Sequence, residues 1–499
     1  MPHLSPFHAA LFTPSARSPL REAVPSSAGT PEARAEAADI SSFLAPTYDQ
    51  VDDEVLAALL RANPANAVTL DAPHGYAGRF RRSPQDASPP KESVTCVSAS
   101  TDYHSARERF DRLVLDRAIT IRSASAFYIV RQTFQSPRHH PHRRHALLGT
   151  LPAVPAGAGA SGGVFGHETT ETVTVDDRLA LLKALEVQTS PVFGLYRDRN
   201  NTVEDWMRER MIDAEPIRFG VGLDGTLHEL WEVDDDRHIR SLISRFGERP
   251  VVIADGHNRF NAAVEWSRQR FAPPARHPAL TTVASASAES IDVSPAAPCV
   301  FALVAEQDPG MRLLPVHRVY YGIRDWSIGR FREAATGVLR VDPVDGPLEQ
   351  LLDHVAQARY EGSHAMGVYD FRTSRCFVST TVDIDPLAAT LSEAPAAWRQ
   401  SDPVLCEHLI NHGILRQQMN GGRMPGCHRI ADLRVIRRGA QDDDPARPQL
   451  AILLMPLSIS DVFDMALSRH LLPPNSTHFV PKFASGLVML PMSRRWSTA

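Results

Sequence analysis

The residue types with the clearest chemical potential follow one another as Asp255-Gly256-His257-Asn258-Arg259. Gly256 permits a tight turn and lets an anion approach the backbone closely. His257 and Arg259 add hydrogen-bond donors, and a guanidinium can hold two phosphate oxygens at once. Asp255 is expected to orient His257 or to bind a magnesium ion. The spacing predicts a phosphate-binding turn; the alternative is that Asp255 only caps a helix and Arg259 lies in solvent.

The neighbouring sequence predicts the elements that would hold this turn. The all-apolar run Val251–Ala254 is typical of a buried strand, and the spacing of apolar residues after the turn predicts a helix from about Asn258 to Phe271. A helix begins with unpaired backbone N–H groups and the positive end of its dipole, which together favour an anion. Strand, glycine turn and helix therefore support the same interpretation.

A second candidate site contains His167, Glu168 and Thr170, directly after a glycine-rich stretch. In the functional interpretation Glu168 is a general base or a metal ligand, and His167 is an acid or a phosphate contact. In the alternative, which the residues alone favour, these are exposed polar loop residues ahead of a helix capped by Thr174 and Asp177.

A third candidate is the segment 473–482, in which prolines bracket Ser476, Thr477 and Lys482. A rigid loop between prolines is a suitable place from which polar side chains reach an anion. A surface turn without a ligand is an equally good interpretation.

Two further patterns are weaker. His317 and Arg318 stand at the start of an expected strand, where an exposed pair on an edge strand is the preferred interpretation and a substrate contact the alternative. The segment Gly220–Gly225 has the letters of a dinucleotide-binding fingerprint, but a strand-like sequence follows it where a helix is required. We therefore dismiss that match.

The composition narrows the classes of function. The chain has 499 residues, of which 43% are hydrophobic and 22% charged, as in a globular protein with several domains. Its net charge of −5 disfavours a nucleic-acid partner. The five cysteines include no Cys-x-x-Cys pair, and no apolar run reaches the roughly 18 residues of a membrane span. The expected compartment is the reducing cytosol, with no membrane partner.

The chain is predicted to alternate between ordered segments and loops. Segments rich in small and polar residues predict mobile loops at 15–38, 135–163 and 273–298. Strands are expected at 191–196, 251–254, 299–304, 317–323 and 487–490. A hairpin is expected at 216–233, with its turn at Asp224-Gly225. Helices are expected at 175–187, 236–246 and 258–271, from Asp402-Pro403 onward, and at 458–468. This mixture favours an α+β class with mixed sheets. The expected parts are an N-terminal part at 1–134, a loop at 135–163, a central motif region at 164–272, a linker at 273–298 and a C-terminal α+β part at 299–499.

The order of these motifs resembles domain-of-unknown-function family 1015 along most of the chain outside the three loops. The matching segments are Ile253 to Phe260 for I-A-D-G-H-H-R-Y, His167 to Thr170 for H-E-x-T, Asp177-Arg178 for D-R, Pro191-Val192-Phe193 for P-[IV]-F, Leu314 to Arg318 for L-P-T-H-R, Pro474 to Lys482 for P-x-S-T-x-F-x-P-K, Ser5-Pro6-Phe7 for P-F, Ala45 to Asp49 for A-P-P-Y-D, and Asn63-Pro64-x-Asn66.

The turn also looks like that of the ParB/sulfiredoxin-like fold, which includes nucleotide-dependent free-serine kinases. By that resemblance Gly256, His257, Asn258 and Arg259 would bind nucleotide phosphates, and Asp255 would support the site or its magnesium ion. The resemblance implies a ParB/sulfiredoxin-like nucleotide-binding core within the α+β fold. No catalytic base carries over from those kinases, so Glu168 is chosen as the base on chemical grounds, with Asp255 and His257 as further catalytic candidates.

The sequence departs from the family pattern at several positions. Asn258 replaces the second histidine of the turn, and Phe260 replaces its tyrosine. Asn475 stands where lysine is usual, and Val175-Asp176 where Lys-Glu often precedes Asp-Arg. Each change alters charge or polarity near the expected site, so a changed substrate or a loss of activity is an open alternative.

These observations predict a phosphotransferase that uses ATP or ADP with Mg²⁺ to phosphorylate a small hydroxyl metabolite, with free serine as one candidate. Phosphoryl transfer depends mainly on positioning and charge neutralisation, which these residue types supply. The first alternative is a regulatory or scaffold protein that binds a nucleotide or a phosphorylated metabolite without turnover. A ParB-like nucleic-acid protein is the less favoured third class, and the oligomeric state stays open.

Overall fold

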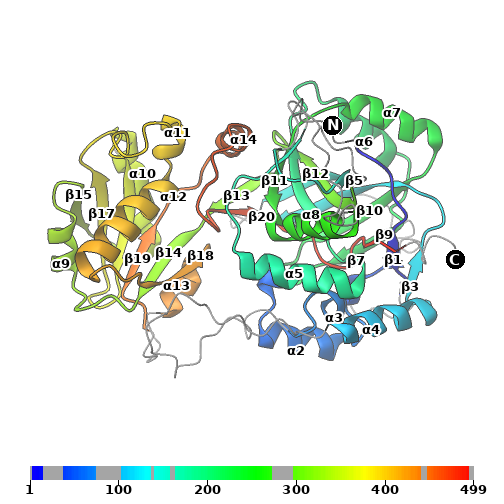
Figure 1. Ribbon diagram of the computed structural model, residues 1–499, viewed down its shortest axis with the longest axis horizontal. Helices are drawn as coiled ribbons and strands as arrows, with labels where there is room; N and C mark the ends of the chain where they lie inside the picture. The colour runs from blue at the N-terminus through cyan, green and yellow to red at the C-terminus, as the bar shows by residue number, and fades with distance from the viewer. Residues whose placement is uncertain are drawn as a thin grey trace, which may run out of the picture. The chain divides into compact units, whose positions relative to one another are not determined.

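The computed structural model describes residues 3–14, 38–74, 103–135, 140–157, 163–271, 296–362, 364–439 and 447–493, which form two compact units (Figure 1). Unit 1 comprises Met1–Phe165, Thr170–Met311 and Pro481–Ala499, and unit 2 comprises Gly166–Thr169 and Arg312–Val480. The segments 15–37 and 272–295, where we predicted loops, lie outside the described residues. Within the described ranges, no helix combines the length and the apolarity needed to cross a membrane.

Unit 1 is built around a nine-stranded mixed sheet with the strand order β2-β9-β10-β4-β5-β12-β8-β11-β6. The pairs β2–β9, β12–β8 and β11–β6 are parallel, and the other neighbours are antiparallel. The strands are β2 (Ala38–Asp39), β4 (Phe127–Gln135), β5 (Pro141–Pro152), β6 (Val164–Phe165), β8 (Val192–Tyr196), β9 (Arg218–Val221), β10 (Leu227–Val233), β11 (Val251–Asp255) and β12 (Pro298–Ala305).

The middle strands of this sheet are apolar and buried, as expected for strands with both faces covered. Every residue of β8 is buried, and so is every residue of β11 before Asp255. The predicted strands at 191–196, 251–254 and 299–304 are confirmed as β8, β11 and β12. The predicted hairpin is confirmed as β9 and β10, with Gly225 at φ +77 between them, a conformation that favours glycine.

Helices of unit 1 pack on the sheet and on one another. They are α2 (Asp53–Ala62), α3 (Val68–Asp71), α4 (His104–Leu115), α5 (Thr172–Leu185), α6 (Thr202–Met211), α7 (Asp236–Phe246) and α8 (His257–Phe271), with the short helical turns η1 (Ser41–Phe43) and η2 (Tyr48–Gln50). Helix α5 packs against α8, and α4 packs against α5 (Figure 1). Two small sheets complete the unit, one of β1 (Ala10–Phe12) with β3 (Ile119–Ile121) and one of β7 (Val187–Gln188) with β21 (Leu490–Pro491).

Unit 2 contains a six-stranded antiparallel sheet in the order β15-β17-β16-β19-β14-β18, with a buried apolar cluster on each face. Its strands are β14 (His317–Tyr321), β15 (Leu339–Val344), β16 (Ala365–Asp370), β17 (Arg375–Thr381), β18 (Gly426–Ile430) and β19 (Leu450–Leu453), and a separate pair joins β13 (Arg312–Pro315) to β20 (Thr477–Val480). Its helices are α9 (Ile328–Ala334), α10 (Leu351–Tyr360), α11 (Ala396–Arg399), α12 (Asp402–Leu405), α13 (Leu433–Gly439) and α14 (Ile459–Leu467), with η3 (Leu348–Gln350) and η4 (Cys406–Met419). Both units therefore mix helices and sheets, which confirms the α+β class.

Three local predictions were wrong. The segment predicted as a loop at 135–163 contains the twelve-residue strand β5, because the apolar residues after His145 enter the core of unit 1 and outweigh the basic start of the segment. The predicted loop at 473–482 contains β20, which gains backbone hydrogen bonds by pairing with β13. The strand predicted at 487–490 is reduced to β21, because the chain there is buried but pairs with neighbours only through an isolated bridge and a two-residue ladder.

Candidate functional site

The strand, glycine turn and helix predicted around Asp255 are confirmed in unit 1. Strand β11 ends at Asp255, Gly256 has φ +93, and α8 begins at His257. The positive φ favours glycine here, and a Cβ atom on residue 256 would lie 2.9 Å from a guanidinium nitrogen of Arg259, which would have to shift. The first turn of α8 closes with a hydrogen bond from the N–H of Phe260 to the carbonyl of Gly256, at 2.9 Å.

Arg259 does not lie in solvent, as the capping interpretation had it. Its guanidinium donates to Asp255 Oδ2 at 2.7 Å, to Ser190 Oγ at 3.0 Å and to the carbonyl of Pro191 at 2.6 Å. The side chain is 13% exposed, and its Nε is buried without a hydrogen-bond partner among the described residues. Arg259 therefore braces the turn against the start of β8, and it is only partly available to a ligand.

Lys482 reaches the same turn from the last part of the chain. Its Nζ lies 3.1 Å from Asp255 Oδ1 and also pairs with Asp49, while the side chain is 9% exposed. Gln132 of β4 holds the backbone of this residue by donating to the carbonyl of Lys482 at 3.1 Å. The chain has 53 lysines and arginines, and only three of them are lysines, Lys482 included. A compact ammonium can bridge two separate carboxylates, whereas the planar guanidinium suits a single bidentate partner.

The charges at this turn shift one another's protonation. Burial favours the neutral form of Asp255, but the positive charges of Lys482 and Arg259 outweigh it and lower the pKa of Asp255 to about 2. Burial likewise opposes the ammonium of Lys482, but Asp255 and then Asp49 outweigh it and raise the pKa of Lys482 above its ordinary value. At neutral pH all these groups are charged, and the turn carries a closed network of ion pairs.

Two further segments approach the turn within unit 1. Tyr48, next to Asp49, accepts a hydrogen bond from Asn258 Nδ2 at 3.3 Å, and the guanidinium of Arg178 lies 4.2 Å from the centre of the Tyr48 ring. Burial raises the pKa of Tyr48 well above its ordinary value, so its hydroxyl stays protonated. One turn along α8 from Asn258, the amide of Asn261 donates to Thr170 Oγ1 at 3.1 Å. Thr170 therefore lies beside α8, as a substrate contact at this site would require.

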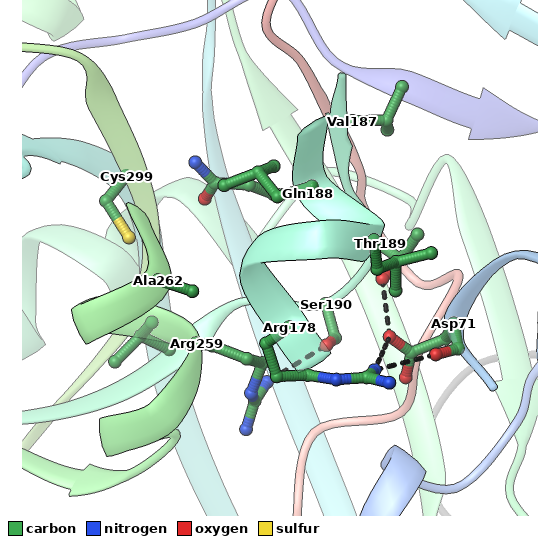
Figure 2. A pocket seen from close by; sticks show the side chains of 12 residues that line it. Asp71, Arg178, Val187, Gln188, Thr189, Ser190, Arg259, Ala262 and Cys299 are labelled. Carbon is green, nitrogen blue, oxygen red and sulfur yellow. Dashed lines mark hydrogen bonds and ion pairs between the residues drawn. The ribbon is translucent and has the colours of Figure 1, made fainter. Parts of the chain in front are cut away.

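A cavity of about 40 Å³ lies behind the turn, lined by Arg178 from α5 and Arg259 from α8 (Figure 2). Asp71 contacts two other residues of this lining. Its Oδ1 accepts a hydrogen bond from Thr189 Oγ1 at 2.6 Å and lies 3.9 Å from the guanidinium of Arg178. Ser190 completes the polar part of the wall. The hydrogen bonds and ion pairs along this wall hold the side chains of Arg178 and Arg259 in place.

His167 and Glu168 of the second candidate group lie in unit 2 and are not part of the exposed loop that the residues alone favoured. His167 is fully buried, and Glu168 Oε1 accepts hydrogen bonds from the N–H of Ser476 at 3.1 Å, from the N–H of Thr477 at 2.8 Å and from Thr477 Oγ1 at 2.5 Å. His167 Nε2 lies 2.7 Å from the same Thr477 hydroxyl. The predicted caps are also wrong, because α5 begins after Glu171 without a side-chain cap. The H-E and S-T motifs thus meet within unit 2.

The interpretation of His317 and Arg318 as an exposed edge-strand pair was wrong as well. Both side chains are buried on β14, which lies between β19 and β18. His317 Nδ1 accepts from the N–H of Leu454 at 3.2 Å, and Arg318 donates to the carbonyl of Asn475 at 2.9 Å. Burial, helped by the charge of Arg318, lowers the pKa of His317 to about 4. Arg318 therefore supports the loop that carries Ser476 and Thr477.

The predicted site residues thus separate into two groups, each described within its own unit. Unit 1 holds Lys482, Thr170 and the turn from Asp255 to Arg259; unit 2 holds His167, Glu168, Ser476, Thr477, His317 and Arg318. The sequence analysis did not assign Tyr48, Asp49, Asp71, Arg178 and Ser190 to the site. Two signals pointed to some of them, since Tyr48-Asp49 and Asp177-Arg178 belong to the motifs that carry the family resemblance.

The turn does not fit a magnesium ion held by Asp255. Oδ2 of Asp255 is paired with Arg259 and Oδ1 with Lys482, so a cation of the protein already occupies each oxygen. Magnesium needs oxygen ligands in near-octahedral geometry and would have to displace one of these side chains. The start of α8, with its backbone donors and the neighbouring Lys482, suits an anion better.

Comparisons with known proteins give a family and a set of distant structures. A family model described as "Protein of unknown function (DUF1015)" matches residues 28–399. No curated protein matches the chain. Solved structures with some likeness include a free serine kinase in complex with AMP (8% identity, 66% of this chain and 85% of that chain, TM-score 0.30), a conserved hypothetical protein from Pyrococcus furiosus (9%, 64% and 90%, 0.28) and SbnI with a C-terminal truncation from Staphylococcus aureus (7%, 66% and 82%, 0.31). At these TM-scores the likenesses carry no argument about this chain.

Proposed function

The chain belongs to the DUF1015 family of proteins of unknown function, and within that family we propose that it binds the phosphate groups of a nucleotide at the start of α8 and transfers a phosphoryl group to a small hydroxyl compound. ATP or ADP is the proposed donor, and free serine is one candidate acceptor. The observation that carries the proposal is the turn itself, in which Gly256 adopts a φ of +93 directly before the fifteen-residue helix α8.

Three features of the turn support phosphate binding. The first N–H groups of α8 point toward any anion at its N-terminus, and the helix dipole adds attraction. His257, the first residue of α8, is only partly buried and adds a ring nitrogen at that end. Lys482 and Arg259 hold positive charge against Asp255, so an incoming phosphate meets cations that are already fixed in position.

Phosphoryl transfer demands positioning and charge neutralisation more than covalent chemistry by the protein. Asp255 and His257 are the catalytic candidates at the turn itself, whereas Glu168, chosen as the base on chemical grounds, belongs to unit 2. However, Oε1 of Glu168 is engaged by three donors of Ser476 and Thr477. This observation favours the second candidate function, a regulatory protein that binds a nucleotide or a phosphorylated metabolite without turning it over.

Calorimetry of the full chain with ATP, ADP and AMP tests the binding step, and the sharpest variant is His257→Asp. An acidic residue in the first turn of a helix stabilises the helix, so this variant should fold at least as well as the wild type. The same charge repels a phosphate, and we expect nucleotide affinity to fall about tenfold or more, roughly 1.4 kcal/mol. The matched control is His257→Asn, which removes the ring without adding charge.

The outcomes separate the candidate functions. Nucleotide binding that His257→Asp weakens and His257→Asn largely keeps supports a phosphate at this turn. An incubation of the wild type with ATP or ADP and a panel of hydroxy amino acids then decides between transfer and binding alone, with the phosphorylated product read by mass spectrometry. If the wild type binds none of the three nucleotides, the phosphotransferase proposal is abandoned.

A further inference from the structure

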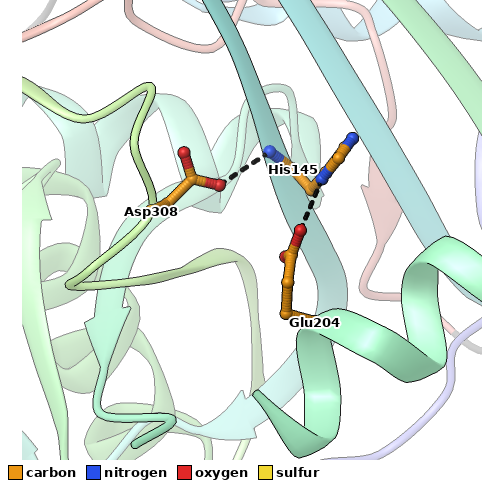
Figure 3. Close-up of side chains that lie close together, drawn as sticks. All are labelled: His145, Glu204 and Asp308. Atoms are coloured by element: carbon orange, nitrogen blue, oxygen red, sulfur yellow. Dashed lines mark hydrogen bonds and ion pairs between the residues drawn. The ribbon is translucent and has the colours of Figure 1, made fainter.

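A second polar cluster in unit 1 lies outside the residues used so far. His145 of β5, Glu204 of α6 and Asp308 after β12 each offer one ligand atom, and these atoms lie within 4.8 Å of one another (Figure 3). His145 Nδ1 is 2.7 Å from Glu204 Oε1, and the backbone N–H of His145 donates to Asp308 Oδ2 at 3.2 Å. Three segments far apart in the sequence therefore present an imidazole and two carboxylates to one point.

The cluster is built on rigid supports. Asp198 accepts hydrogen bonds from the backbone N–H groups of Thr202, Val203 and Glu204, so the first turn of α6 and the direction of the Glu204 side chain are set. Asp308 Oδ1 accepts from the N–H of Gly310 at 2.7 Å. Such preorganisation is what a metal site requires of its ligands.

The loop that carries Asp308 is also pressed tightly against β5. A Cβ atom on Gly310 would lie 2.2 Å from the carbonyl oxygen of Arg143, so no other residue fits at that position. The backbone of Asp308 donates to the carbonyl of Ala305 at 3.0 Å, which closes a turn directly after β12. The distance between Asp308 and His145 is therefore set by the backbone and not by flexible side chains.

Two buried oxygens at this cluster have no hydrogen-bond partner within the described ranges. One is Oε2 of Glu204, a residue only 8% exposed, whose Oε1 is shared by His145 and by Arg208 at 2.8 Å. The other is the hydroxyl of Tyr196 on β8, a fully buried residue. A buried oxygen without a partner costs about 1–3 kcal/mol, and a cation bound here would satisfy the carboxylate oxygen.

The cluster holds the two carboxylates of Glu204 and Asp308, and Arg208 pairs with Glu204. Arg208 is more than half exposed, so its positive charge is screened by solvent.

We propose that His145, Glu204 and Asp308 form a binding site for a single divalent transition-metal ion of the zinc type. An imidazole nitrogen among carboxylate oxygens selects such an ion over Mg²⁺ or Ca²⁺, which prefer oxygen alone. Metal bonds of about 2.0–2.2 Å space their donors by roughly 3–4 Å, so the three side chains need to move only slightly. The ion would replace the proton between His145 and Glu204 and tie β5, α6 and the end of β12 together.

The test is a titration of Zn²⁺ into the full chain after removal of metals with a chelator, followed by calorimetry, with the visible absorption of Co²⁺ as a second readout. The wild type should bind one ion and melt at a higher temperature in its presence. Glu204→Gln and Asp308→Asn, which keep the shape of the side chains, should each lower the affinity by at least about 100-fold. The matched control is His142→Ala on the same strand, which should bind the ion as the wild type does.

Two results would overturn the proposal. The first is a wild type that binds no Zn²⁺, or binds it without a rise in melting temperature. The second is equal binding by the wild type, by Glu204→Gln and by Asp308→Asn, which would show that other histidines capture the ion. Either result would leave the cluster as an ion pair between His145, Glu204 and Arg208 with a structural role only.

Discussion

The turn around Asp255 in unit 1 and the loop around Glu168 in unit 2 use their charged residues in different ways. At the turn, Asp255 is paired with two cations, Lys482 and Arg259, which lie beside the start of a helix. At the loop, Glu168 is held by two backbone N–H groups and one hydroxyl, all from Ser476 and Thr477. Both carboxylates come from motifs of the same family resemblance, although the residues alone favoured a functional role only at the turn.

The comparison separates a carboxylate that pairs with side-chain cations from a carboxylate that holds a loop in place. Charges that are paired side chain to side chain beside the N-terminus of a helix can rearrange around an incoming anion. A carboxylate whose acceptor oxygen is filled by backbone donors holds a loop in place, and removing it leaves those donors without partners. The comparison therefore predicts large electrostatic effects at the turn and mainly structural effects at the loop.

The largest effect is expected at Lys482. Lys482→Met removes the ammonium between Asp255 and Asp49 and should lower the free energy of unfolding by about 3–5 kcal/mol, because two carboxylates lose their partner in a largely buried place. Chemical denaturation measures the loss. Lys183→Met, at an exposed position of α5, is the control and should change stability by less than about 0.5 kcal/mol. A loss below 1 kcal/mol at Lys482 would contradict the tight network described here.

The pH dependence of stability tests the buried histidine His317 of unit 2. Burial lowers the pKa of His317 from 6.5 to about 4, so between these values the unfolded chain binds a proton that the folded chain does not. Stability should therefore fall by about 3 kcal/mol as the pH drops from 6.5 to 4, and this contribution should level off below pH 4. His317→Gln should remove that part of the slope in melting temperature, while the similarly shifted His228 of unit 1 keeps its own part. An unchanged slope in the variant would contradict the assignment.

Removing the hydrogen bonds of Glu168 should have a somewhat smaller effect on stability. Glu168→Ala leaves the N–H groups of Ser476 and Thr477 without their acceptor and should cost about 2–3 kcal/mol locally. Hydrogen exchange of the peptide over 472–480 is the direct measurement, and its amides should exchange faster. Glu393→Ala, an exposed glutamate of the same unit, is the control that should leave this exchange unchanged. Wild-type protection in Glu168→Ala would show that the loop is held by other contacts.

The stabilising contribution of Asp255 at the turn should be lost at a lower pH than that of His317. The pKa of Asp255 is lowered to about 2, so its stabilising effect is complete above its ordinary pKa near 4 and is lost as the pH falls from 4 toward 2. The expected loss is on the order of 2 kcal/mol. Asp255→Asn should be less stable than the wild type at pH 6 but should lose less of its stability between pH 4 and 2. Parallel acid unfolding curves for the two proteins would rule this out.

Much of the fold was predictable because local patterns agree with tertiary structure. The apolar run at 251–254, the glycine and the helix after it were identified together, since a buried strand, a positive φ and a helical apolar spacing each leave a clear mark in the sequence. The β9–β10 hairpin was identified by Asp224-Gly225 for the same reason. Strand β5 was missed because its first residues are basic and its apolar half follows them.

The partners of the turn were decided by tertiary structure alone. Lys482 follows Asp255 by more than two hundred residues, and nothing local in the sequence indicates that β20 and the chain after it bring that lysine to the end of β11. The burial of His167, His317 and Arg318 was likewise unpredictable, since a polar residue is buried only when distant segments supply its hydrogen bonds. By itself the sequence determined the family, the α+β class and the strand–glycine–helix arrangement at 251–271, because these depend on local spacing. The pairing of charges depends on which distant segments meet, and that was settled only when the chain packed its strands and helices together.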